Sequence, residues 1–203
     1  MSSEPTKELW KRNKMIRQYF VCIKEKLDIS EVENVISAFL GVDNIRKKSD
    51  NVLTFYADDI LKNTISKSIH TLSNDLDSSL LILVSPENVP LAEYVLKKLS
   101  FYHSEGFYSL SQGVIELITK KDEFIKNYLF SLFSGLEYSL ALTGKTYIEN
   151  GFSISKSCVS LSLHRNTMEY RLKKIYELYG LDLHSFDDGI LFLTYLSLSG
   201  ICA

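Results

Sequence analysis

The sequence predicts an α+β protein in which a small α/β part is followed by an all-helical part. Segments with strand patterning alternate with helical segments between residues 52 and 110, and strand patterns stop at Ser111. The helical remainder contains a short helix, a tight turn and a longer helix. A chain of 203 residues, 45% of them hydrophobic, is long enough to bury one or two cores.

Composition narrows the class of protein. No apolar run reaches the roughly 18 residues that a membrane span needs, and the N-terminus lacks the apolar block of a secretory signal. We therefore expect a cytoplasmic protein without a membrane partner. The three cysteines, Cys22, Cys158 and Cys202, lack Cys-x-x-Cys spacing, which argues against a disulfide framework and against a cysteine-rich zinc site.

Residues 1–28 are predicted to form an N-terminal amphipathic basic helix. Residues 1–27 carry seven basic and three acidic side chains, and the apolar residues recur at helical spacing. These apolar residues are Leu9, Trp10, Ile16, Tyr19, Phe20 and Ile23. We interpret the helix as a domain or dimer element, with membrane or DNA binding as the alternative.

Residues 29–110 are predicted to form the small α/β domain. A helix over residues 30–40 is indicated by Ser30 and Glu33 at capping-box spacing and by Gly41 as its C-terminal cap. The remaining predicted elements are a strand over 52–56, a helix starting at Asp58, a strand over 80–84, a helix after Pro90 and a short strand over 106–110.

Residues 111–203 are predicted to be helical, with a helix-turn-helix over residues 152–179. Helical spacing continues over 113–119, 122–134 and 136–149. Asn150 and Gly151 indicate a helix stop, and Ser153 or Ser155 can cap the following short helix. A longer helix then begins near His164, after a turn over Leu161–Leu163.

The run from His164 to Ile175 places polar and basic side chains on the first turn of that longer helix. Arg165 and Asn166 are the candidates for contacts with DNA bases, because arginine can bond guanine O6 and N7 and asparagine can bond adenine in the same bidentate way. The alternative is a solvated polar turn with caps. Candidates for contact with the DNA backbone are Ser153, Ser155, Lys156, His164, Thr167, Tyr170, Arg171 and Lys174.

Behind these donors the helix carries an apolar stripe, for which we expect a place in the core. Its members are Met168, Leu172, Ile175, Leu178 and Leu181. Tyr170 is equally compatible with packing and with DNA contact. The net charge of residues 164–175 is only +3, from four basic and one acidic side chain. Because so few charges bind phosphate weakly, we expect a homodimer or higher homo-oligomer on double-stranded DNA.

Two other motifs invite chemical interpretations that we reject. Gly144-Lys145-Thr146 lacks the earlier glycine of a phosphate loop and lies within a helical segment, where Gly144 indicates close helix packing. Asp58 and Asp59, with Glu87 and Glu93 downstream, form the one acidic group that could hold a metal, but Asp58 more simply caps a helix. With no catalytic arrangement or cofactor motif, we expect neither enzymatic activity nor a cofactor.

The longer helix and the residues that follow it resemble the C-terminal domain of PucR-type regulators, bacterial transcription factors that include purine-catabolism and carbohydrate-diacid regulators. The matching residues are His164-Arg165-Asn166-Thr167, Tyr170-Arg171-Leu172, Ile175, Glu177-Leu178, Gly180-Leu181-Asp182-Leu183, Asp187-Asp188 and Ile190-Leu191. The segment 142–151 is similar to the first helix of that domain. The helix pair also resembles the DNA-binding end of the factor for inversion stimulation.

The resemblance implies that residues 50–118 are similar to a degenerate diguanylate-cyclase-like domain, without the Gly-Gly-Asp-Glu-Phe motif that cyclase activity needs. The sequence departs from the family pattern at Glu169, where a basic or neutral residue is usual, and at Cys158 and Ser162 near the turn. An acid close to phosphates lowers affinity unless it accepts a hydrogen bond from a cytosine amino group.

The sequence thus favours a sequence-specific DNA-binding transcription regulator that inserts helix 164–175 into the major groove. The α/β half would supply dimerisation or the response to an unknown small-molecule effector. The alternative is a protein-interaction module with a vestigial helix-turn-helix, which the balanced charge of residues 152–203, five basic and five acidic, keeps open.

Overall fold

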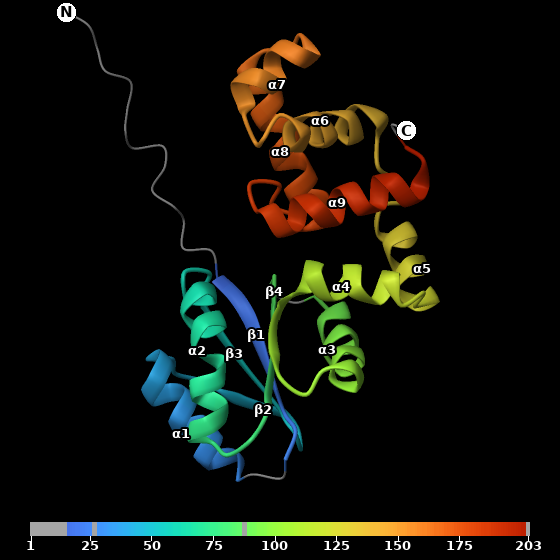
Figure 1. Ribbon diagram of the computed structural model, residues 1–203. Coiled ribbons are helices and arrows are strands. Elements are labelled where there is room, and N and C mark those ends of the chain that lie inside the picture. The colour runs from blue at the N-terminus through green and yellow to red at the C-terminus, as the bar shows by residue number, and fades with distance from the viewer. Residues whose placement is uncertain (1–15, 26–27, 87–88, 202–203) are drawn as a thin grey trace, which may run out of the picture. The chain divides into compact units, whose positions relative to one another are not determined.

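The computed structural model describes residues 16–25, 28–86 and 89–201. The chain divides into two compact units, Met1–Phe107 and Tyr108–Ala203. The first contains a mixed α/β structure and the second is built of helices, so the α+β fold class is confirmed (Figure 1).

The first unit is built around a sheet with the strand order β2-β3-β1-β4-β5. The central strand β1 (Ile16–Ile23) pairs antiparallel with β3 (Val52–Asp58) on one side and with β4 (Leu80–Ser85) on the other. The edge strands are β2 (Arg46–Ser49) and β5 (Gly106–Ser109). The helices of this unit are α1 (Ile29–Leu40), α2 (Leu61–Asp75) and α3 (Leu91–Tyr102).

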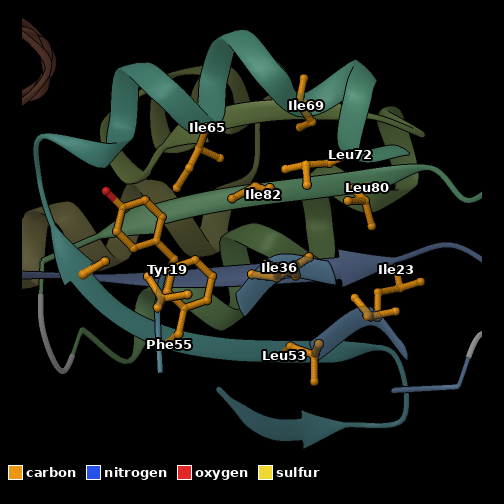
Figure 2. Packing of buried hydrophobic residues seen from close by; sticks show 14 of the residues in the cluster. Tyr19, Ile23, Ile36, Leu53, Phe55, Ile65, Ile69, Leu72, Leu80 and Ile82 are labelled. Atoms are coloured by element: carbon orange, nitrogen blue, oxygen red, sulfur yellow. The ribbon is translucent and has the colours of Figure 1, made fainter. Parts of the chain in front are cut away.

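Helices cover both faces of the sheet, with α1 and α2 on one face and α3 on the other (Figure 1). On the first face, Ile65, Ile69 and Leu72 of α2 point at the sheet, and Tyr19 stacks on Phe55 with ring centroids 5.1 Å apart (Figure 2). The alternate residues of β1 are buried as well, because they point to the face that α3 covers. Removing this apolar surface from water stabilises the unit.

The prediction of a basic helix near the N-terminus is wrong for residues 16–23, which form the central strand β1. Strands that are buried on both faces are apolar at every position, as Tyr19 to Ile23 are, and such a run also satisfies helical spacing. The sheet therefore starts at Ile16 and not after residue 28. Residues 1–15 and 26–27, where the rest of the predicted helix falls, lie outside the described residues.

Smaller differences occur at element ends. Helix α1 begins at Ile29 and is capped by Asp28, whose Oδ1 accepts from the backbone N–H of Ser30 at 3.0 Å, so Ser30 is not its cap. Asp58 ends strand β3, and α2 begins only at Leu61. The short edge strand β2, whose residues are all exposed, was not predicted. Gly41 ends α1 in the left-handed conformation, as expected.

The second unit contains α4 (Leu110–Thr119), α5 (Glu123–Leu132), α6 (Tyr138–Glu149), α7 (Ile154–Leu161), α8 (Arg165–Tyr179) and α9 (Phe186–Ser199). The order and approximate bounds of α4 to α8 follow the predicted helical segments, whereas no bounds were predicted for α9. Its core includes Phe133, which stacks on Tyr195 at 4.3 Å and meets Phe192 edge to face at 5.8 Å. Helices α6, α7 and α8 contact one another and form a three-helix group (Figure 1).

Candidate nucleic-acid interface

The turn between α7 and α8 is a Schellman motif, which fixes the angle at which α8 leaves α7. The N–H of Leu163 donates to the carbonyl of Cys158 at 2.9 Å, and the N–H of Ser162 donates to that of Val159 at 3.2 Å. Ser162 adopts the left-handed conformation, with φ +52°, that glycine usually supplies at this position. The predicted helix, turn and helix are therefore present.

Side chains cap both helices of the pair. Ser153 Oγ accepts from the N–H of Lys156 at 3.4 Å and starts α7, as one of the two predicted caps. His164 Nδ1 accepts from the N–H of Asn166 at 3.2 Å and starts α8. These caps satisfy backbone donors that the first helical turns leave without intrahelical partners.

Side-chain hydrogen bonds also join the end of α6 to α7. The side-chain amide of Asn150 donates to Ser160 Oγ at 3.2 Å and to Ser157 Oγ at 3.4 Å. Ser157 is fully buried, and its hydroxyl donates to the carbonyl of Ser153 at 2.8 Å. The predicted helix stop at Asn150 thus also positions α7 on α6.

The apolar stripe of α8 packs into the core, as predicted, through Met168, Leu172 and Ile175. The following residue of the predicted stripe, Leu178, is 54% exposed, so its assignment to the core is wrong. Helical spacing places Leu178 about 90° from the centre of the buried stripe, too far round the helix for burial. Leu181, beyond the end of α8, is buried as expected.

The opposite face of α8 is exposed and carries Asn166, Tyr170 and Lys173 at spacings of four and three residues. Tyr170 is 63% exposed, so its ring lies at the surface and not in the core. Lys173 was not among the predicted candidates, although its spacing from Asn166 could have identified it. Its ammonium lies 3.3 Å from Glu177 on the same helix.

The two candidate base contacts differ in their surroundings. Asn166 is exposed at the start of α8. Arg165 Nε donates to Glu169 Oε1 at 2.8 Å, one helical turn further along. This hydrogen bond and the negative charge of Glu169 raise the pKa of Arg165. Glu169, the acidic residue at which the sequence departs from the family pattern, is therefore paired with Arg165, one of the two candidate base contacts.

Two candidate backbone contacts are directed at α6. Arg171 Nη1 donates to Thr143 Oγ1 at 3.1 Å and to the carbonyl of Ser139 at 3.5 Å. Lys174 Nζ donates to Glu137 Oε1 at 3.1 Å, and this contact raises the pKa of Lys174. Both cations hold α8 against α6. The remaining candidates lie near the surface: Ser155, Lys156 and His164 are exposed, and Ser153 and Thr167 are half-buried.

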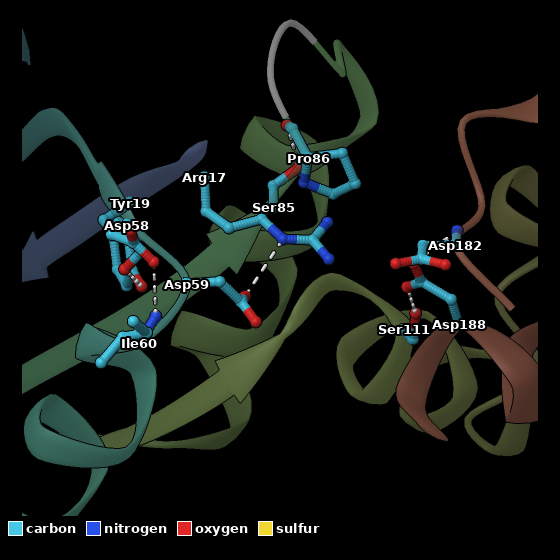
Figure 3. A network of polar contacts seen from close by, with 10 residues as sticks. All are labelled: Arg17, Tyr19, Asp58, Asp59, Ile60, Ser85, Pro86, Ser111, Asp182 and Asp188. Carbon is cyan, nitrogen blue, oxygen red and sulfur yellow. Dashed lines mark hydrogen bonds and ion pairs between the residues drawn. The ribbon is translucent and has the colours of Figure 1, made fainter. Parts of the chain in front are cut away.

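The acidic residues noted in the sequence serve structural contacts (Figure 3). Asp58 Oδ1 accepts from the N–H of Ile60 at 3.0 Å, and Asp59 pairs with Arg17 Nε at 3.1 Å. In the second unit, the buried Asp188 accepts from Ser111 Oγ at 3.2 Å and from the N–H of Asp182 at 3.0 Å. These bonds join α9 to α4 and to the segment after α8.

The described residues contain no cluster of three or more histidine, cysteine, aspartate or glutamate side chains that could hold a metal ion. Glu87, one of the acidic residues considered in the sequence, lies outside them. Gly144 lies inside α6, and a Cβ there would meet Phe192 Cε1 at 2.5 Å, so this glycine serves close helix packing as predicted. Within the described ranges, no helix is long and apolar enough to cross a bilayer.

A short helix, a Schellman turn and a longer helix with an exposed polar leading face define the helix-turn-helix class. Residues 140–198, which begin within α6 and reach into α9, match the profile of the PucR C-terminal helix-turn-helix domain. The resemblance expected from the sequence is confirmed.

Relatives match in parts of the chain. The carbohydrate diacid regulator of Escherichia coli (strain K12) is 56% identical over 39 residues, 19% of this chain and 10% of that protein. The uncharacterized protein YxkF of Bacillus subtilis (strain 168) is 32% identical over 78 residues, 38% of this chain and 26% of that protein. The matched segments thus span about a quarter or less of these relatives.

A solved structure, the regulator of polyketide synthase expression from Bifidobacterium adolescentis, aligns with 92% of this chain and 81% of its own, with 16% identity and a TM-score of 0.48.

Proposed function

We propose that this chain is a sequence-specific DNA-binding transcription regulator that inserts the first turns of α8 into the major groove. The exposed face of α8 carries the proposal, because it places Arg165 and Asn166 at the leading end of a helix whose opposite stripe is buried. The major groove admits an α-helix, and its base edges match the donors and acceptors of these two side chains.

Each proposed contact follows from the position of its side chain. We assign Arg165 and Asn166 to base edges. We assign His164, Thr167, Tyr170 and the newly recognised Lys173 to flanking phosphates. Ser153, Ser155 and Lys156 lie at the N-terminal end of α7, where backbone N–H groups and the helix dipole favour a phosphate.

Arg171 and Lys174 differ from the other proposed backbone contacts, because their side chains already contact residues at α6. The guanidinium of Arg171 is bonded to neutral acceptors on α6, so we propose that it acts by holding α8 in place. Lys174 keeps its proposed phosphate contact, but a phosphate must compete with Glu137 for its ammonium.

The modest charge of residues 164–175 supports a homodimer or higher oligomer on paired half-sites. In this proposal the α/β unit supplies dimerisation or the response to a small-molecule effector, and the protein acts in the bacterial cytoplasm without catalysing a reaction. Neutralising more phosphates per complex raises affinity and makes it more sensitive to salt.

The proposal is tested by selection from DNA duplexes with a randomised centre, using the full chain. The double variant Arg165→Ala, Asn166→Ala is expected to lose base preference at the positions these residues face, by about tenfold or more per position. Lys156→Ala is expected to weaken binding to all duplexes alike, because a phosphate contact carries no sequence information.

Lys126→Ala is the control, since it removes an exposed lysine of α5, outside the helix pair. It is expected to bind like the wild type. A double variant that selects the same sequences as the wild type would show that α8 is not the recognition helix.

A second candidate function is that of a protein-interaction module with a vestigial helix-turn-helix. Exposed apolar side chains on the helix pair favour it: Val159 is 81% exposed, Leu178 54% and Tyr176 52%. Salt separates the two candidates. Binding that engages phosphates weakens steeply as salt is added, whereas an apolar contact with a protein does not.

A further inference from the structure

The ion pair of Arg165 and Glu169 lies on the part of α8 that the proposed function brings to the bases. The two side chains are one helical turn apart, with Nε 2.8 Å from Oε1. The arginine side chain is 60% exposed and the glutamate 43%. An exposed pair of this kind adds little to folding stability, so stability does not explain an acid at this place.

The contact uses one particular donor of the guanidinium. Arginine has five N–H donors in a planar fork, and Glu169 engages the single one on Nε. The four donors on the two terminal nitrogens stay available, and two of them suffice for the bidentate contact with guanine O6 and N7. Glu169 therefore leaves the base-contacting edge of Arg165 intact while it restrains the side chain.

Restraint of a long side chain favours specificity. An unrestrained arginine populates many rotamers and reaches phosphates and several bases, and ordering it on binding costs free energy. A carboxylate near the DNA also repels phosphates and lowers the affinity for every sequence. Such an arrangement lowers the affinity for all DNA sequences and strengthens the preference for one base.

We propose that Glu169 is a positioning residue that holds Arg165 for guanine and so sets the base preference at the position that Arg165 faces. This inference rests on the proposed function. It differs from a direct contact of Glu169 with a cytosine amino group, because here Glu169 acts on the base through the side chain of Arg165.

The test compares Glu169→Ala and Glu169→Gln in the full chain, by selection from randomised duplexes and by titration of one unselected duplex. Glu169→Ala is expected to lower the preference for guanine about tenfold. It is also expected to tighten binding to the unselected duplex, because one repulsive charge is gone. Glu169→Gln is expected to retain the preference, since its side-chain carbonyl can still accept from Nε, while it too binds the unselected duplex more tightly.

Glu177→Ala is the matched control, because Glu177 pairs with Lys173 at the same spacing on the same helix but has no contact with Arg165. It should leave the preference for guanine unchanged. In an Arg165→Ala background, Glu169→Ala should have no further effect on base preference.

The possible failures are distinguishable. If Arg165→Ala changes base preference and Glu169→Ala does not, the positioning role is wrong and the proposed function stands. If Glu169→Ala alters preference equally in the Arg165→Ala background, Glu169 contacts a base directly and the inference is overturned. If the wild type enriches no sequence, the proposed function fails and this inference fails with it.

Discussion

At the scale of the residue, side chains of the same chemical type have different tasks on α8. Arg165 extends from an exposed turn, whereas Arg171, six residues later, donates to Thr143 and to the carbonyl of Ser139 on α6. Sequence spacing put both among the DNA contacts. It could not distinguish them, because the partners of Arg171 lie 28 and 32 residues away in the chain.

Gly144 provides a prediction at this scale. Gly144→Ala is expected to destabilise the protein by about 1–3 kcal/mol, because the added methyl group would lie 2.5 Å from Phe192 Cε1 and 3.0 Å from Leu183 Cδ1 in a packed core. Urea unfolding of the full chain measures the change. Gly135→Ala is the control, since a Cβ at that exposed position meets nothing within 4 Å. Equal stability of the two variants would contradict the tight packing of α6 on α9.

At the scale of the element, some local end signals were predicted correctly and others were not, since the cap of α1 is Asp28 and not Ser30. Gly41 and Ser153 act as expected, because a cap depends only on residues within a turn of the helix end. The strand β1 was predicted as a helix, since its apolar run fits both periods. Only pairing with β3 and β4, which lie about thirty and sixty residues further along the chain, decides between them.

The turn between α7 and α8 provides the prediction at this scale. Ser162→Gly is expected to stabilise the protein by about 1 kcal/mol, because Ser162 holds a left-handed conformation that disfavours a side chain. Thermal or urea unfolding measures the change, and base preference should stay the same. Ser155→Gly, inside α7 and exposed, is the control and should destabilise by about 0.5 kcal/mol. A loss of stability in Ser162→Gly would mean that its hydroxyl matters more than its backbone.

At the scale of the whole molecule, we propose that the regulator binds DNA through more than one copy of its helix-turn-helix. We predict that the full chain binds a duplex with two selected half-sites at least tenfold more tightly than one in which either half-site is scrambled, since each mismatched pair costs about 1–3 kcal/mol. Binding titrations at fixed salt measure the ratio. Scrambling the spacer at constant length is the control. Equal affinity for the single and paired sites would contradict a dimer on paired half-sites.

Periodicity, caps and the dense motif of α8 are local properties, so they were enough to predict the α+β class, the helix-turn-helix and its likeness to the PucR C-terminal domain. The tertiary structure alone decided that residues 16–23 are the central strand of the sheet. It also decided that Arg171 and Lys174 are held by α6, and that Leu178 lies at the surface. These outcomes depend on contacts between segments far apart in the chain, which local patterns do not encode.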